Sequence, residues 1–247
     1  FVNLPVVLLP GTLCDSDLFA HQLDALGSRA AVGDISRSCS IEAIAACVLA
    51  DAPPRFALAG LSLGGIVAVE VAHQAPQRVA GLALLDTSLA APDDGQLRAR
   101  RRWERDVRSG HFARVVGEMV GTLTIDPALN GQTILEMALR IGPKVFLRQN
   151  EALLHRRDRA DDLASFVGPI LVACGHDDKI CPPTSHYDLV MRVPHARLAV
   201  VDGAGHLSTL DQPEALTSVL EEWLETCSNN NIDNQTRRVN THECTKI

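Results

Sequence analysis

The feature that most constrains this chain is the pentapeptide at residues 60–64, which has the pattern G-x-S-x-G and separates two apolar segments of different period. Residues 56–61 form an apolar run of strand length, whereas residues 64–74 carry apolar side chains at helical spacing. A strand that turns this abruptly into a helix holds its middle residue at positive φ, where flanking side chains would collide, so glycines are needed. The turn predicts a Ser62 hydroxyl that is lifted clear of the sheet, beside the Leu63 amide and the helix N-terminus.

Two interpretations of this turn are open. Ser62 is either an ordinary helix N-cap in a glycine-rich turn or a nucleophile. Glycine and serine are common in turns, so the pentapeptide alone carries limited weight. Its position between a predicted strand and a predicted helix favours the nucleophile.

Apolar runs alternate with amphipathic segments on both sides of the turn. Strands are predicted at residues 6–9, 30–35, 56–61, 79–86, 170–174 and 197–201. Helices are predicted at residues 18–26, 40–50, 64–74, 183–191 and 213–226. This alternation predicts an α/β fold with a mostly parallel, doubly wound sheet covered on both faces.

The alternation is interrupted between residues 91 and 167, where helical segments alone are predicted. They lie at residues 96–108, 111–121, 131–139 and 143–155. We therefore expect a helical insertion at 91–167, carried on a core of residues 1–90 and 168–227. Residues 228–247 lose their apolar periodicity, which predicts a polar extension outside the fold.

The first predicted helix of the insertion carries six arginines. They are Arg98, Arg100, Arg101, Arg102, Arg105 and Arg108. The acidic residues Glu104 and Asp106 alternate with them, so the charge pattern favours a solvated helix face over an anion site.

Composition narrows the function classes. The 247 residues, 46% of them hydrophobic and 21% charged, suit one large globular domain, and a net charge of −7 disfavours a nucleic-acid binder. No apolar run reaches the roughly 20 residues of a membrane span. The chain enters a strand almost at once, so no signal peptide is expected. Seven scattered cysteines without C-x-x-C suit reduced thiols in the cytoplasm, and nine histidines without a metal-binding spacing predict no metal.

A serine nucleophile needs a base, and the base needs an orienting carboxylate. Candidates follow the last two strands: His176, Asp177 and Asp178 after residues 170–174, and His206 in a glycine loop after residues 197–201. Because His206 follows both the serine and the acid in chain order, it is the preferred base, with His176 as the alternative. Either aspartate is a possible acid.

These motifs in this order resemble the α/β-hydrolase superfamily over residues 5 to about 226. Relatives carry the acid in a G-x-x-D-x-x-x-P pattern, which residues 175–182 fit, so the resemblance selects Asp178 over Asp177. Some lipases carry the acid at the position of Asp86 instead, and here Asp86 is interpreted as structural.

The resemblance also implies an oxyanion hole. Its first donor comes from a loop usually written His-Gly-x, which is Pro10-Gly11-Thr12 in this chain. The backbone amides of Thr12 and Leu63 are therefore the expected donors, with Leu13 as an open alternative to Thr12. Relatives carry a helical cap over the site where this chain has residues 91–167.

The predicted function is hydrolysis of small to medium carboxylic esters by Ser62, His206 and Asp178 through an acyl-enzyme, without cofactor or metal. The partner is a small-molecule ester or lactone. A lactonase, a carbon–carbon bond hydrolase or an acyltransferase on the same triad remains an alternative. A ligand-binding protein that keeps the pocket without turnover is the alternative from another class.

Overall fold

One parallel sheet forms the centre of the molecule. The structure, a computed structural model, describes the backbone of residues 4–243 and the side chains of residues 4–228. Within it, six strands pair in the order β2-β1-β3-β4-β5-β6, and every neighbouring pair is parallel. They are β1 (Val6–Leu9), β2 (Ala30–Val32), β3 (Phe56–Leu61), β4 (Val79–Leu85), β5 (Ile170–Gly175) and β6 (Ala196–Val201). The predicted α/β class and parallel sheet are confirmed.

The strand order reverses between β1 and β3. The chain passes from β1 outward to β2, returns to β3 on the other side of β1, and then proceeds to β6. In open α/β sheets, the loops at such a reversal leave a crevice at the carboxyl ends of the strands. Here those loops hold Thr12, after β1, and Ser62, after β3.

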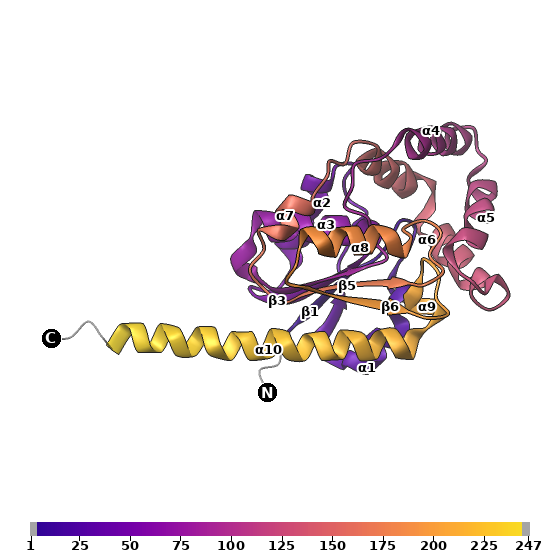
Figure 1. The fold of residues 1–247 in the computed structure, drawn as a ribbon. Coiled ribbons are helices and arrows are strands. Elements are labelled where there is room, and N and C mark those ends of the chain that lie inside the picture. The colour runs from indigo at the N-terminus through magenta and orange to yellow at the C-terminus, as the bar shows by residue number, and fades with distance from the viewer. Residues whose placement is uncertain (1–3, 244–247) are drawn as a thin grey trace.

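Helices cover both faces of the sheet (Figure 1). One face packs against α2 (Ile41–Asp51), α3 (Leu63–Gln74), α7 (Ala160–Ala164) and α8 (Pro183–Arg192). The other packs against η1 (Ser16–Phe19), α1 (Ala20–Leu26) and α10 (Pro213–Glu243), and α9 (Ser208–Asp211) lies just before α10. Short η2 (Gly27–Arg29) and η3 (Pro76–Arg78) precede β2 and β4. Every residue of β3, β4 and β5 is buried, which explains why these strands have continuous apolar sequences.

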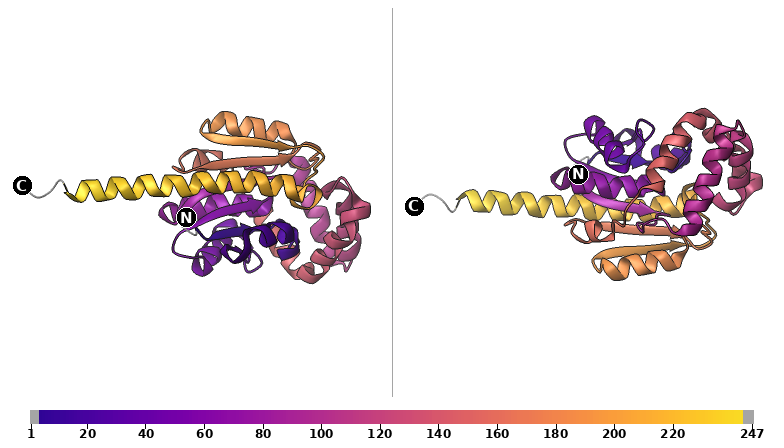
Figure 2. Two further views of the ribbon diagram at one scale, coloured as in Figure 1. Left: turned by 90° about the horizontal axis from the view of Figure 1, so that it is seen from below. Right: turned by 90° about the horizontal axis from the view of Figure 1, so that it is seen from above.

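Three further helices gather at one end of the molecule (Figures 1 and 2). They are α4 (Asp94–Arg108), α5 (Phe112–Leu123) and α6 (Pro127–Leu154), and we call them the cap helices. Gly142, with φ 80° and ψ 168°, interrupts α6 just before Pro143, which accounts for the two segments predicted there. The cap helices share a small apolar cluster that includes Val115, Ala138 and Phe146. That residues 91–167 form a separate unit stays a prediction.

Two predicted boundaries are wrong, and one short helix was missed. β2 ends at Val32 rather than at residue 35, because the Asp34 side chain accepts a hydrogen bond from the Ser36 amide and turns the backbone. The five-residue α7 was not predicted. The last helix continues to Glu243 instead of ending at Thr226, and Figure 1 shows it extending past the sheet. Residues 228–243 contain neither Gly nor Pro, so the sequence has no strong helix breaker there.

The C-terminal tail and the cysteines bear on two further predictions. That residues 228–247 lie outside the packed fold stays a prediction, and residues 244–247 lie outside the described residues. Cys14, Cys39, Cys47, Cys174, Cys181 and Cys227 are free thiols. The cytoplasmic location inferred from them stays a prediction. None of the described helices combines the length and apolar character that crossing a membrane requires.

Candidate active site

Ser62 occupies a strained turn between β3 and α3. Its backbone has φ 54° and ψ −115°, a region that non-glycine residues rarely adopt. A Cβ atom added at Gly60 would lie 2.2 Å from the Gly64 carbonyl oxygen, and one added at Gly64 would lie 2.1 Å from the Leu9 carbonyl oxygen. Both positions therefore require glycine, for the steric reason that the pentapeptide suggested.

The structure brings Ser62, His206 and Asp178 into one hydrogen-bonded chain. His206 Nε2 lies 3.0 Å from Ser62 Oγ, and His206 Nδ1 lies 2.9 Å from Asp178 Oδ2. We assign the ring proton to Nδ1, because a carboxylate there accepts a hydrogen bond and leaves Nε2 free to accept the serine proton. Each residue comes from a different loop at the carboxyl edge of the sheet, after β3, β5 and β6 respectively.

The loop that holds Asp178 fixes the carboxylate from its other side. Asp178 Oδ1 accepts hydrogen bonds from the amides of Ile180, at 2.8 Å, and Cys181, at 2.9 Å. A Cβ atom at Gly175 would lie 2.2 Å from the Gly205 carbonyl oxygen, so glycine lets the acid loop and the histidine loop touch. Asp178 and His206 are both buried.

Burial alone lowers the pKa of His206, but the hydrogen bond and charge of Asp178, together with the charge of Asp86, outweigh it. The net effect raises the pKa of His206 above its ordinary value. The imidazolium that forms when His206 accepts a proton is thereby stabilised, as a general base next to a carboxylate requires.

The alternative acid and base lie elsewhere. His176 and Asp177 are exposed and form a contact of 3.5 Å with each other. Within the described residues, neither makes a hydrogen bond to Ser62 or His206. The structure therefore offers no geometric support for either alternative.

Asp86 lies at the end of β4 and is fully buried. Its Oδ1 accepts a hydrogen bond from the Gly175 amide at 2.8 Å, and its Oδ2 lies 2.5 Å from the Ser208 hydroxyl. Burial raises the pKa of Asp86 to about 7; the His206 charge opposes this rise and the Asp178 charge adds to it. Asp86 thus holds the two loops that carry Asp178 and His206 without bonding to the imidazole, which fits the structural interpretation. No sequence pattern indicates its contact with Ser208, which lies 122 residues away.

Three amides near Ser62 are candidate oxyanion donors. The Leu13 amide donates to Gln149 Oε1 at 3.0 Å and is therefore already occupied. The Thr12 and Leu63 amides have no acceptor in the described part of the chain. This difference favours Thr12 over Leu13 as the partner of Leu63. Gln149 belongs to α6, so a cap helix positions this loop, a contact that sequence patterns do not reveal.

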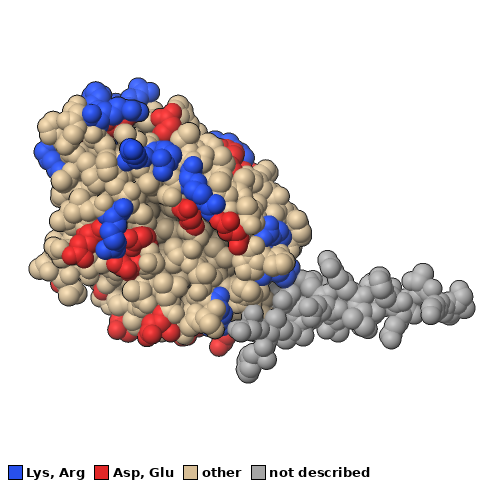
Figure 3. Space-filling view, turned by 180° about the vertical axis from the view of Figure 1, so that it is seen from behind, with Lys and Arg blue, Asp and Glu red and all other residues tan. Residues whose placement is uncertain are grey.

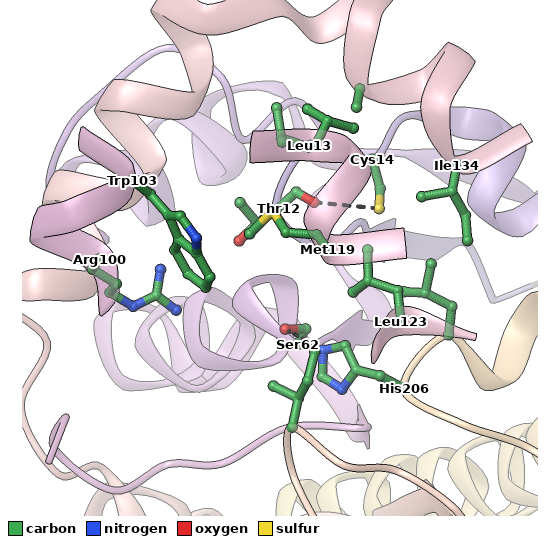
Figure 4. A pocket seen from close by; sticks show the side chains of 15 residues that line it. Thr12, Leu13, Cys14, Ser62, Arg100, Trp103, Met119, Leu123, Ile134 and His206 are labelled. Atoms are coloured by element: carbon green, nitrogen blue, oxygen red, sulfur yellow. Dashed lines mark hydrogen bonds between the residues drawn. The ribbon is translucent and has the colours of Figure 1, made fainter. Parts of the chain in front are cut away.

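A cavity of about 90 Å³ lies over Ser62 (Figure 4). The loop after β1, the cap helices and the loops of Ile180 and His206 all contribute to its wall. Its lining includes Thr12, Leu13, Arg100, Trp103, Met119 and Ile134. The cavity is much smaller than the roughly 300–1,000 Å³ typical of sites for drug-sized molecules, so it suits a short chain.

Arg100 differs from the other five arginines of α4. Those five are exposed, and Figure 3 shows basic side chains interspersed with acidic ones over the cap end of the molecule, as a solvated face requires. Arg100 is partly buried and lines the cavity instead. The prediction of a solvated face is therefore wrong for Arg100, because the packing of α4 on α6 turns this one side chain inward.

Asp178, Cys181 and His206 offer possible metal-ligand atoms within 4.8 Å of one another. Both Asp178 oxygens and His206 Nδ1 already hold hydrogen bonds, however. Burial also raises the pKa of the Cys181 thiol far above its ordinary range, whereas a metal ligand must be a thiolate. This donor set fits a hydrogen-bonded triad better than a metal site.

Comparison with known proteins agrees with this geometry. The sequence model of the alpha/beta hydrolase family matches residues 6–219. The chain belongs to this family. Pimeloyl-[acyl-carrier protein] methyl ester esterases are among its relatives. That of Neisseria meningitidis serogroup A is 27% identical over 75% of this chain and 62% of its own length. That of Nitrosomonas europaea is 28% identical over 81% of this chain and 83% of its own.

A solved structure shows the same similarity. The thermophilic esterase of Thermogutta terrifontis, with malate bound, superposes with a TM-score of 0.81 and 27% identity, covering 91% of this chain and 90% of that one. The chain covers less than two thirds of the length of some relatives, as with the 62% of the Neisseria protein. This α/β-hydrolase thus has esterases among its relatives in both sequence and structure.

Proposed function

We propose that this protein is a serine hydrolase that cleaves carboxylic esters of small acyl groups through an acyl-enzyme on Ser62. The observation that carries the proposal is the continuous path from Ser62 Oγ through His206 to Asp178, with hydrogen-bond distances of 3.0 and 2.9 Å. The family membership and the esterases among the relatives support it.

In the proposed mechanism, Ser62 Oγ attacks the carbonyl carbon while His206 Nε2 accepts its proton. Asp178 holds the imidazole and stabilises its charged form. The Thr12 and Leu63 amides donate to the oxyanion that develops on the carbonyl oxygen. The intermediate then expels the alcohol, which leaves with the proton from His206. Water attacks the acyl-enzyme in the same way, which releases the acid and restores Ser62.

The first test is turnover of p-nitrophenyl esters from acetyl to long acyl chains. We expect wild type to prefer short chains, since the cavity is about 90 Å³. Ser62→Ala should lower kcat by about 10⁴- to 10⁶-fold, because a serine triad works as a unit. Ser28→Ala, which removes an exposed hydroxyl, is the matched control and should retain wild-type rates. Equal rates for wild type and Ser62→Ala would contradict the nucleophile assignment.

Multiple turnover separates the proposal from the alternatives. A burst of one equivalent followed by no further release would indicate a ligand-binding protein that becomes acylated. Activity on lactones or carbon–carbon substrates, but on none of the esters, would indicate that the same three residues catalyse one of those reactions instead. Acyl transfer to an added alcohol in preference to water would indicate an acyltransferase.

A further inference from the structure

Arg100 brings a positive charge into the cavity over Ser62. It lies on α4, and Figure 4 shows its side chain reaching into the pocket on the same side as Trp103, with Ser62 and His206 opposite. One cavity therefore contains both the nucleophile and a guanidinium group. A small molecule bound there can contact the two at once.

Few of the Arg100 donors are used by the protein. A guanidinium has five N–H donors, and within the described side chains the one hydrogen bond of this group goes to Asn150 Oδ1 at 3.3 Å. No carboxylate among those side chains forms an ion pair with it, whereas Arg102 and Arg108 on the same helix pair with Glu118 and Glu104. Even a partly buried charge without a counter-ion loses part of its hydration, so this arrangement calls for an explanation.

A second arginine increases the local positive potential. Arg156 is buried, and its hydrogen bonds within the described residues go to the Ala90 and Leu153 carbonyls and to Gln96 Oε1, all neutral acceptors. Burial and the charge of Arg156 lower the pKa of Arg100 to about 10, so Arg100 remains protonated at neutral pH. An anion in the cavity would offset both the burial and the repulsion.

Trp103 supplies another unused donor one helical turn from Arg100. It lines the same cavity, and its buried indole Nε1 has no hydrogen-bond acceptor among the described residues. Figure 4 shows the Trp103 ring on the wall of the pocket, on the same side as Arg100. Buried polar groups are nearly always paired, so an unpaired donor beside an unpaired cation indicates an acceptor that comes from outside the protein.

We propose that Arg100, with the Trp103 indole N–H, binds a free carboxylate of the substrate, so that the preferred substrates are short esters or lactones that carry a second, ionised carboxyl group. A carboxylate matches the planar guanidinium fork and leaves more of the small cavity for the chain than a phosphate does. This inference rests on the proposed function, because it names the substrate class of the Ser62 site.

The test compares substrates that differ only in a terminal group. Mono-p-nitrophenyl succinate carries a carboxylate where p-nitrophenyl butyrate carries a methyl group, so the kcat/KM ratio of the two measures carboxylate recognition in the acyl part. The glycolate and ethyl esters of butyric acid, followed by acid release, do the same for the alcohol part. The rate with Ser62→Ala is subtracted to remove spontaneous hydrolysis.

In at least one of the two pairs, we expect wild type to favour the charged substrate, and Arg100→Gln to lower that ratio about tenfold or more. Arg100→Lys should give an intermediate ratio, and Trp103→Phe a smaller loss, because Phe removes the N–H and keeps a ring. Arg98→Gln, which removes an exposed charge from the same helix, is the control and should keep the wild-type ratio. Unchanged ratios in both pairs for Arg100→Gln and Arg100→Lys would overturn the inference.

A binding measurement keeps this inference separate from the proposed function. Calorimetry of Ser62→Ala with monomethyl succinate and with methyl butyrate tests recognition without turnover. Binding of the carboxylate ester that is lost on adding Arg100→Gln supports the Arg100 site even if no ester is hydrolysed. Stronger Arg100-dependent binding of inorganic phosphate than of succinate would overturn the carboxylate assignment. No Arg100-dependent binding, alongside normal hydrolysis of neutral esters, would overturn the inference and leave the proposed function standing.

Discussion

The carboxyl edge of the sheet and the cap helices differ in how far their buried polar groups are paired within the protein. At the sheet edge, Ser62, Asp178 and His206 are bonded to one another, and the buried Asp86 is bonded to the loops that carry them. In the cap, the buried donors of Trp103 and Gln149 Nε2 have no acceptor in the described part of the chain, and Arg100 has most of its donors free. The four side chains at the edge are thus paired within the described part of the protein, whereas these donors of the cap helices are not.

Glycines show the same contrast. Added Cβ atoms at Gly60, Gly64 and Gly175 would collide with backbone atoms at 2.1 to 2.2 Å, whereas at Gly117 and Gly121 in α5 they would meet nothing within 4 Å. The sheet edge is therefore packed to a fixed geometry, and the cap has room for change. A sheet edge of fixed geometry next to helices that tolerate substitution allows the cavity wall to change while the arrangement around Ser62 is preserved.

The largest expected difference is the one between substitutions of the two buried acids at the sheet edge, Asp178 and Asp86. Asp178→Asn should lower kcat about 10⁴-fold, because the amide no longer orients the imidazole or stabilises its charge. Asp86→Asn should lower kcat less than about tenfold, since an asparagine oxygen still accepts the Gly175 amide and its NH₂ group can donate to Ser208. Measuring kcat for ester hydrolysis by both variants shows which of the two acids supports the imidazole. A larger loss for Asp86→Asn would make Asp86 the acid instead.

The next effect compares one glycine from each region. Gly64→Ala should destabilise the protein by about 3 kcal/mol or more, because the new Cβ would overlap the Leu9 carbonyl oxygen. Gly117→Ala should stabilise it by about 0.5–1 kcal/mol, since an exposed mid-helix glycine gains helix propensity without a collision. Free energies of unfolding from denaturant titration measure both. Equal values for the two variants would remove the contrast between a fixed edge and a tolerant cap.

The smallest expected effect is the change of kcat/KM with pH, which depends on His206 at the sheet edge and not on the cap helices. His206 must be neutral to accept the Ser62 proton, so kcat/KM should fall about tenfold per pH unit below its pKa, with a midpoint above 6.5. Stability changes in the opposite direction: the raised pKa adds stability that is present below pH 6.5 and is lost as pH rises through the folded pKa. A pH profile on a neutral ester, with Arg98→Gln as control, measures the midpoint. A midpoint below 6.5 would contradict the influence of Asp178.

Much of the fold could be predicted from the sequence because its signals are local. Continuous apolar runs identified the buried strands, and alternation with helical segments predicted the parallel sheet. The Ser62 turn was recognisable because crowding at the strand-to-helix junction restricts residues 60 and 64 to glycine. Selecting Asp178 over Asp177 needed the family resemblance. In the structure, Asp178 is buried, whereas Asp177 is exposed to solvent. The catalytic roles of Ser62, Asp178 and His206 stay predictions.

Only the tertiary structure decided which side chains the cavity receives. Along α4, the arginines form one charged series, although helical spacing places Arg100 on the same face as Leu97, Trp103 and Val107. The sequence does not show what that face packs against. The docking of α4 on α6 turns Arg100 and Trp103 toward Ser62 and leaves Arg98 in solvent. In the same way, Gln149 occupies the Leu13 amide across 136 residues of sequence. The steric limits of a tight turn act within a few residues, so neighbouring residues suffice to predict them. The surroundings of a cap helix face depend instead on contacts with segments that are distant in the sequence.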